Sequence, residues 1–232
     1  NKRDSEILTQ VNLMRIVVLC NPPFRDDYSV YLCEALQEIG GSITVIPYVQ
    51  KGGAIEPLPL KVKEVWTPTF FIFQIIKHLV RDKPDIVHLQ FDLNAFGSIW
   101  NLLLTPLLLF LVRLLIRIRL ITTIHIVLPK KFIMSRFLSQ ELPYKIRLPS
   151  QVLLTLITFI YRSTSFLSNA VIVHAKCFKR TLVTDYKVPV DKVYVIPHGV
   201  YLEPRVDPSL LEALRNRMGR NRRIILYFGR IS

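Results

Sequence analysis

Residues 85–91, DIVHLQF, and residues 119–127, RLITTIHIV, decide the fold class of this chain. Both are short runs rich in β-branched and other apolar residues, and neither alternates strictly between apolar and polar positions. Continuous apolar runs are typical of strands that are buried on both faces, as in a parallel sheet. The segment between the two runs is long enough for a crossover helix, so together they predict a strand–helix–strand unit.

The same pattern continues in both directions along the chain. Further strand candidates lie at residues 14–20, 42–49, 61–66, 170–175 and 192–197. Segments with apolar residues at helical spacing lie between several of them, at residues 28–40, 70–82 and 150–165. Alternating strands and helices predict an α/β fold with a doubly wound, mostly parallel sheet and right-handed crossovers.

The C-terminal segment differs from the rest. Residues 201–223 are polar and arginine-rich, which is typical of a connector. Within them, Asp207 and Pro208 predict the N-cap and first position of a short helix that ends near Met218. Residues 224–228, IILYF, predict a buried strand, which either opens a second domain or returns to the first sheet. We favour the first alternative, which divides the chain into a tail (1–13), a complete domain (14–200), a linker (201–223) and the first strand of a truncated domain (224–232).

Composition limits the compartment and the partners. Three cysteines, Cys20, Cys33 and Cys177, are far apart and form no Cys-x-x-Cys pair, which indicates a reducing compartment such as the cytoplasm. The polar N-terminus predicts no secretory signal. A net charge of +14 calls for an anionic partner, which could be a nucleic acid, a membrane surface or a phosphorylated ligand.

Four of the five histidines, His88, His125, His174 and His198, lie at or near the carboxyl ends of predicted strands. Ligands of open α/β sheets bind in the crevice outside these ends. We interpret His88 and His174 as partly buried histidines whose ring nitrogens bond to backbone groups. No HxH or HxxxH spacing supports a metal site, so none is predicted.

An ordered series of motifs, DIVHLQF, ITTIH, SNAVIVHA, VYVIPHGV and IILYFGR, resembles the N-terminal half of a family-4 glycosyltransferase of the GT-B fold. The resemblance runs from about Met14 to Ser232. It implies a Rossmann-like domain and transfer of a sugar from a nucleotide-sugar donor, with retention of configuration and without a metal or other cofactor. The glutamate pair and nucleobase pocket of the family's second domain would lie beyond Ser232, so we expect this chain alone to be incomplete and inactive.

The resemblance also implies roles for individual residues. His125 corresponds to the family's histidine facing the transferred sugar, although it could instead be a structural residue at a strand end. Gly229 and Arg230 correspond to the donor diphosphate site, and guanidinium groups suit phosphate oxygens. His198 and Gly199 correspond to a turn before the interdomain linker, which predicts a hinge.

The loop NPPFRDDYS departs from the family pattern, because it has two prolines where the family usually has glycines. Close approach of its backbone to a phosphate is therefore in doubt. Its charged residues, Arg25, Asp26 and Asp27, could instead bind the acceptor substrate. The alternative is a charged loop that only contacts solvent.

Two segments bear on a membrane. Residues 95–112 carry no charge, and we interpret them as a covered crossover helix, with a transmembrane span as the alternative. Residues 130–147 mix bulky apolar residues with bases that include Lys130, Lys131 and Arg136, which is typical of an interfacial segment on an anionic membrane. The alternative there is a solvated basic loop.

Together these features predict the acceptor-side half of a glycosyltransferase at the cytoplasmic face of a membrane, with a lipid-linked or glycan acceptor. The alternative is a non-catalytic binding or scaffold protein that uses a glycosyltransferase-like domain. No nucleic-acid partner is expected, because the chain contains no recognised RNA- or DNA-binding motif and its basic residues are scattered.

Overall fold

The computed structural model describes residues 14–20, 28–47, 61–62, 70–93, 99–134, 149–199 and 207–218. The chain divides into two compact units, Asn1–Pro197 and His198–Ser232. The larger unit contains the sheet and its helices, and the smaller one contains a single described helix.

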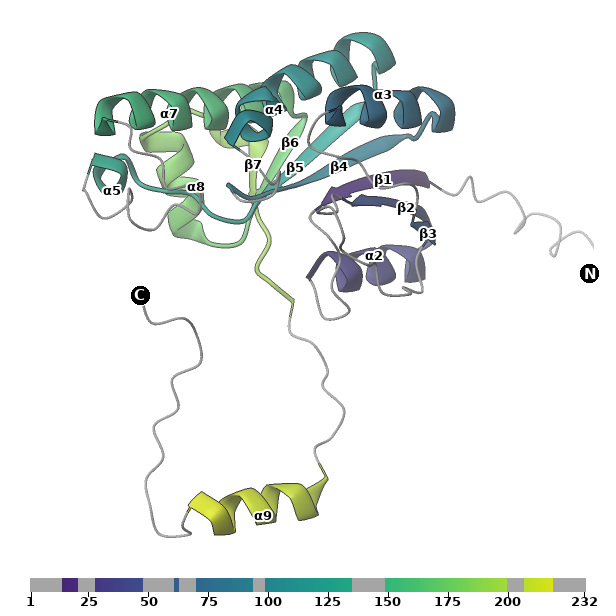
Figure 1. Cartoon of the computed structure of the whole chain (residues 1–232), viewed down its shortest axis with the longest axis vertical. Coiled ribbons are helices and arrows are strands. Elements are labelled where there is room, and N and C mark those ends of the chain that lie inside the picture. Colours follow the sequence, from purple (N-terminus) through teal and green to yellow (C-terminus); the bar gives the residue numbers. More distant parts are fainter. Residues whose placement is uncertain are drawn as a thin grey trace, which may run out of the picture. The chain divides into compact units, whose positions relative to one another are not determined.

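A parallel sheet forms the centre of the larger unit (Figure 1). Its described strands are β1 (Met14–Cys20), β2 (Gly41–Pro47), β3 (Lys61–Val62), β4 (Ile86–Phe91), β5 (Arg119–Ile124), β6 (Ala170–Val173) and β7 (Val193–Val195). They are arranged in the order β3-β2-β1-β4-β5-β6-β7, and every pairing between neighbours is parallel. The predicted α/β class and parallel sheet are therefore confirmed.

Helices cover both faces of this sheet. The longer ones are α2 (Tyr28–Glu38), α3 (Phe71–Asp82), α4 (Ile99–Leu111), α7 (Ser150–Leu167) and α8 (Lys176–Thr184). The shorter ones are the π-helical turn η2 (Val112–Ile116), α5 (Lys130–Met134) and the 3₁₀ turn η3 (Val190–Lys192). Figure 1 shows α2 on the opposite side of the sheet from α3 and α4. The chain adds strands on one side of β1 and then on the other, and right-handed crossovers in opposite directions place their helices on opposite faces.

Alternate residues of the central strands belong to two different hydrophobic clusters. In β1, Ile16, Val18 and Cys20 pack in the cluster that includes α2, whereas Val17 and Leu19 belong to the larger cluster under α3, α4 and α7. Both faces of the strand are therefore buried, which is why its sequence is a continuous apolar run.

Four segments differ from the expectations or lie outside the described residues. Helix α8 was not predicted, because its sequence KCFKRTLVT is short and mostly polar. Of the strand predicted at residues 61–66, only Lys61–Val62 belongs to the described residues, and the strand predicted at residues 224–228 lies outside them. Residues 95–112 were expected to form a covered helix, but the outer side of α4 is exposed among the described residues. None of the described helices has the length and apolar content that crossing a membrane requires.

The described helix of the smaller unit is α9 (Pro208–Met218). The Ser209 backbone N–H donates to Asp207 Oδ1 at 2.9 Å, so the predicted N-cap is confirmed. This hydrogen bond holds the pKa of Asp207 below its usual value.

Candidate functional site

A row of polar side chains lies on one face of the central strands, toward their carboxyl ends. In β4, Val87, Leu89 and Phe91 belong to the hydrophobic cluster under α3 and α4. Because successive residues of a strand point to opposite faces, His88 and Gln90 project from the other face. Both are buried, so this part of the sheet interior is polar and its groups require hydrogen-bond partners.

These side chains form a hydrogen-bonded relay from β4 to β5. Gln90 lies in register with Thr123, and the Thr123 hydroxyl is 2.8 Å from His88 Nε2. The Gln90 amide nitrogen lies 3.2 Å from the same His88 nitrogen. On its other side, the Gln90 amide oxygen lies 2.8 Å from Nε2 of His125, the residue that follows β5. The relay therefore connects the buried middle of the sheet to its carboxyl edge.

The relay is consistent with a neutral His88 and with one orientation of the Gln90 amide. Burial lowers the pKa of His88 to about 4, so its ring is neutral near pH 7 and its Nε2 can accept from the Gln90 amide N–H. With the amide in this orientation, its oxygen accepts the Nε2–H of His125. This hydrogen bond fixes the orientation of the His125 ring at the end of β5.

Three rings pack together at this edge. The centroid of the Tyr28 ring, at the start of α2, lies 5.4 Å from that of His125 and 5.3 Å from that of His174, both with edge-to-face geometry. The two imidazole centroids are 5.0 Å apart. His174 Nδ1 lies 2.9 Å from the Ile196 carbonyl oxygen, so the N–H of this nitrogen donates to the backbone as expected from the sequence.

Two buried tyrosines hold the loop that follows His125. The Tyr161 hydroxyl donates to the Ile126 carbonyl at 3.0 Å and accepts from the Leu128 N–H at 3.4 Å. The Tyr186 hydroxyl donates to the Leu128 carbonyl. Burial raises the pKa of both tyrosines, so the hydroxyls stay protonated and remain donors. The position of His125 is therefore fixed from the strand side by Gln90 and from the loop side by these hydroxyls.

The structure brings together only part of the predicted site. His125 lies at the carboxyl edge, and His88 and His174 lie beside it; Gln90, Thr123, Tyr28, Tyr161 and Tyr186 were not predicted. A polar residue two positions after His88 in a buried strand was the available signal for Gln90. Six predicted residues lie outside the described residues: Arg25, Asp26, Asp27, Arg136, Gly229 and Arg230.

The remaining predicted residues have different surroundings. Lys130 and Lys131 begin α5, and Lys130 Nζ lies 5.7 Å from the centroid of the Tyr186 ring. His198 and Gly199 belong to the smaller unit, where His198 is exposed. A Cβ added to Gly199 would meet no atom within 4 Å, so space does not require glycine there.

The side chains at this edge can form hydrogen bonds to a ligand and hold it in position. In the described part of the larger unit this edge places two imidazoles together, those of His125 and His174. The arrangement suits a neutral polar ligand rich in hydroxyl groups, which can bond to imidazole and phenol groups and stack on their rings.

Comparisons with known proteins agree with this description. The model of Glycosyltransferase Family 4 matches residues 27–204. A solved glycosyltransferase from Rickettsia africae ESF-5 is 18% identical with a TM-score of 0.54, over 89% of this chain and 50% of its own. The UDP-GlcNAc 2-epimerase from Methanocaldococcus jannaschii is 15% identical with a TM-score of 0.45, over 79% of this chain and 45% of its own. A sequence search of curated proteins finds no match. The chain thus spans about half the length of the solved glycosyltransferase.

Proposed function

Because this chain belongs to glycosyltransferase family 4, we propose that it forms the acceptor-side domain of an enzyme that transfers a sugar from a nucleotide-sugar donor to an acceptor. The observation that carries the proposal is the position of His125. It follows β5 at the carboxyl edge of a parallel sheet, where ligands of such folds bind, and its ring is held by Gln90, Tyr28 and His174.

In this proposal His125 positions the transferred sugar rather than acting as a nucleophile. The Gln90 amide oxygen holds the His125 ring through its hydrogen bond to Nε2, and the ring so held forms a hydrogen bond to a hydroxyl of the transferred sugar. This hydrogen bond orients the reacting carbon of the transferred sugar. It becomes stronger as the sugar ring changes in the transition state. Transfer proceeds with retention of configuration and without a metal ion.

The donor and the hinge belong to the C-terminal part of the proposal. Gly229 and Arg230 bind the donor diphosphate, and the Arg230 guanidinium supplies paired N–H donors to its oxygens. His198 and Gly199 form a hinge. The match to about half of the solved glycosyltransferase is compatible with assigning the acceptor side to these 232 residues.

The acceptor is lipid-linked or a glycan, and Arg25, Asp26 and Asp27 contact it. The enzyme acts at the cytoplasmic face of a membrane, to which Lys130, Lys131 and Arg136 attach it peripherally. The net charge of +14 supports an anionic surface as a partner, because exposed bases are attracted to acidic lipids.

Transfer of radiolabelled sugar tests the proposal. The full-length protein is incubated with a panel of UDP- and GDP-sugars and with lipid extract or oligosaccharides as acceptors, with and without EDTA. We expect labelled product from one donor, unaffected by EDTA, with the anomeric configuration of the donor when examined by NMR. Binding of acceptor without transfer from any donor would instead support a non-catalytic scaffold.

A further inference from the structure

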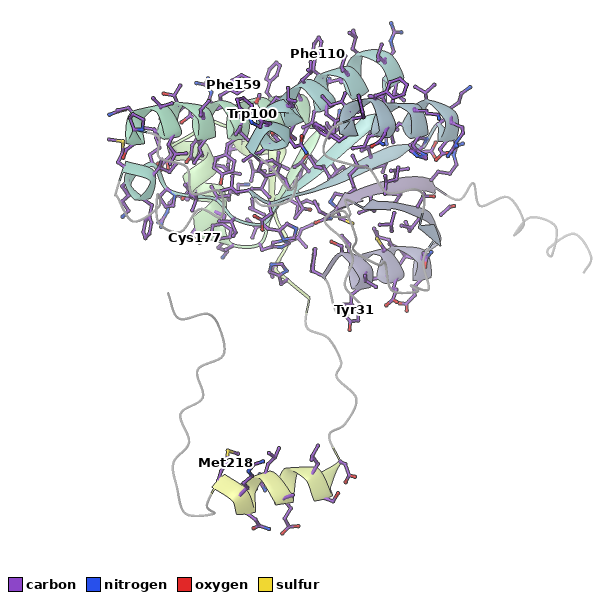
Figure 2. The ribbon with its side chains drawn as sticks, viewed as in Figure 1. Tyr31, Trp100, Phe110, Phe159, Cys177 and Met218 are labelled. Carbon is purple, nitrogen blue, oxygen red and sulfur yellow. The ribbon has the colours of Figure 1, made fainter. Side chains whose placement is uncertain are left out.

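The helices over one face of the sheet expose an apolar surface. Helix α4 buries Leu102, Leu108 and Leu109 against the core, yet its other side is also apolar. Trp100 is 71% exposed and Phe110 is 49% exposed, and Figure 2 shows both on the helical layer that covers the sheet. Six exposed residues of α3, α4 and η2 define what we call the α3–α4 surface: Phe73, Trp100, Leu107, Phe110, Leu114 and Leu115.

Large exposed apolar patches are uncommon on monomeric soluble proteins, and exposed aromatic and aliphatic side chains gathered on neighbouring helices are typical of a binding surface. Within the α3–α4 surface a groove of about 350 Å³ lies between the two helices. Almost all of its lining is apolar, including Phe73 and Ile76 from α3, Phe70 at the N-cap of that helix, and Leu104 from α4. A groove lined in this way suits hydrocarbon and offers almost no hydrogen-bond partner to a polar ligand.

The charged side chains around this surface are mostly basic. The four neighbouring elements α3, α4, η2 and α7 contain a single acidic residue, Asp82, whose Oδ1 lies 3.4 Å from Arg81 Nε. Their basic residues are Lys77, Arg81, Arg113 and Arg162, and the exposed Arg117 and Arg119 follow η2. Arg113 donates to the Leu167 carbonyl at the end of α7, and no ion pair of Arg113 is found within the described ranges. Exposed apolar residues bordered by bases are the composition of an interfacial membrane surface.

We propose that the α3–α4 surface docks this protein on an anionic lipid bilayer, with Trp100 and Phe110 inserted at the level of the headgroups. The surrounding bases complement acidic headgroups, whereas a second copy of the chain would bring like charges together. This inference rests on the membrane location in the proposed function but not on sugar transfer. It makes α3 and α4 the principal contact and leaves the bases of residues 130–147 as an accessory contact.

Tryptophan fluorescence tests the contact directly. The chain has two tryptophans, so Trp66→Phe leaves Trp100 as the only reporter. On addition of phosphatidylglycerol vesicles we expect its emission to shift to the blue and to be quenched by brominated acyl chains. Vesicle binding that leaves Trp100 emission unchanged would overturn the proposal. So would a blue shift on raising protein concentration without vesicles, because a second copy would then cover the surface.

Vesicle sedimentation provides a matched comparison. Trp100→Gln with Phe110→Gln should lower the bound fraction about tenfold or more, since two inserted aromatic side chains are lost. The control is Ile39→Gln with Tyr194→Gln, two residues that are 82% and 54% exposed outside the α3–α4 surface. The control variant should bind vesicles as the wild type does. In 0.5 M NaCl, vesicle binding by the control and by the wild type should weaken, because the salt screens the basic residues.

A third variant separates the two membrane segments. Replacing Lys130, Lys131 and Arg136 with glutamate should leave most of the Trp100 quenching in place. The opposite pair of results would overturn the proposal in favour of residues 130–147. In that case the glutamate variant would lose the Trp100 quenching, and the variant changed at Trp100 and Phe110 would bind vesicles as the wild type does. Transfer to a water-soluble acceptor without vesicles is a separate readout, so failure of membrane docking is distinguishable from failure of the proposed enzyme activity.

Discussion

His125 owes its orientation to a neighbouring strand, and this dependence could not be predicted from the sequence. The strand-end position of His125 is visible in the sequence, as is the resemblance that gives it a role. The Gln90 contact depends on the register between β4 and β5, which brings residues 35 positions apart to 2.8 Å. For the same reason the expectation that His88 bonds to backbone groups was wrong: its partners are the side chains of Thr123 and Gln90.

Gln90 is a positioning residue in this account. Gln90→Leu removes the acceptor for the Nε2–H of His125, so both tautomers and more ring orientations become populated. We expect kcat for transfer to fall roughly tenfold or more with little change in KM. Nitrogen-15 NMR should show a mixture of His125 tautomers in the variant. Gln151→Leu, which changes an exposed glutamine on α7, is the matched control, and an equal loss there would remove Gln90 from the site.

His88 makes stability depend on pH. Its pKa is about 4 in the folded protein and 6.5 in the unfolded chain, so on acidification the unfolded chain takes up the proton first. The contribution is complete above about pH 6.5 and is lost as pH falls toward 4, by on the order of 3 kcal/mol in total. In urea titrations, His88→Gln should flatten the decline of the free energy of unfolding across this window. Identical slopes for both proteins would contradict the buried, neutral state of His88.

At the scale of elements, the positions of strands and helices could be predicted from the pattern of apolar residues. The exposure of their outer side chains could not. The boundaries of β1 and the extent of α3 agree closely with the prediction, because buried strands and a two-sided helix leave clear patterns. Helix α4 is apolar all round, and this pattern does not reveal whether protein or another partner covers its outer side. Helix α8 was missed because a short helix with few apolar residues has too weak a periodicity.

The loop after β5 should depend on its tyrosine hydroxyls. Tyr161→Phe removes the donor to the Ile126 carbonyl and the acceptor for the Leu128 N–H. We expect the free energy of unfolding to fall by about 1 kcal/mol, the usual value for such bonds. Urea denaturation measures it, and Tyr194→Phe, which alters an exposed tyrosine, is the control. Equal stability of Tyr161→Phe and wild type would mean that these bonds do not hold the loop.

For the whole molecule, the fold class could be predicted but the strand order could not. Alternating strands and helices allow several doubly wound orders, and the turn-back from β3 to β4 on the far side of β1 depends on tertiary packing. The chain divides into two compact units, Asn1–Pro197 and His198–Ser232, and the predicted domain end at residue 200 stays a prediction. The domain assignment of residues 201–232 stays a prediction.

The acceptor-side assignment predicts how the isolated 232-residue chain binds ligands. Most donor contacts are expected from a second domain, so calorimetry with UDP- and GDP-sugars should detect no binding in the low micromolar range. The isolated chain should still bind vesicles that contain a mixture of acceptor lipids. Tight binding of a nucleotide sugar by this chain would show that the donor site lies within it and would refute the assignment.

The rate of sugar transfer by His125→Ala tests the central claim most directly. In the full-length protein we expect kcat to fall on the order of 100-fold, the scale of one lost positioned polar group in an active site. Circular dichroism should remain that of wild type and the melting temperature should fall only slightly, because the ring is only partly buried even though the buried Gln90 amide loses one partner. Unchanged kcat would contradict the account and remove His125 from the site, and a loss of activity that only follows a loss of stability would reduce His125 to a structural residue.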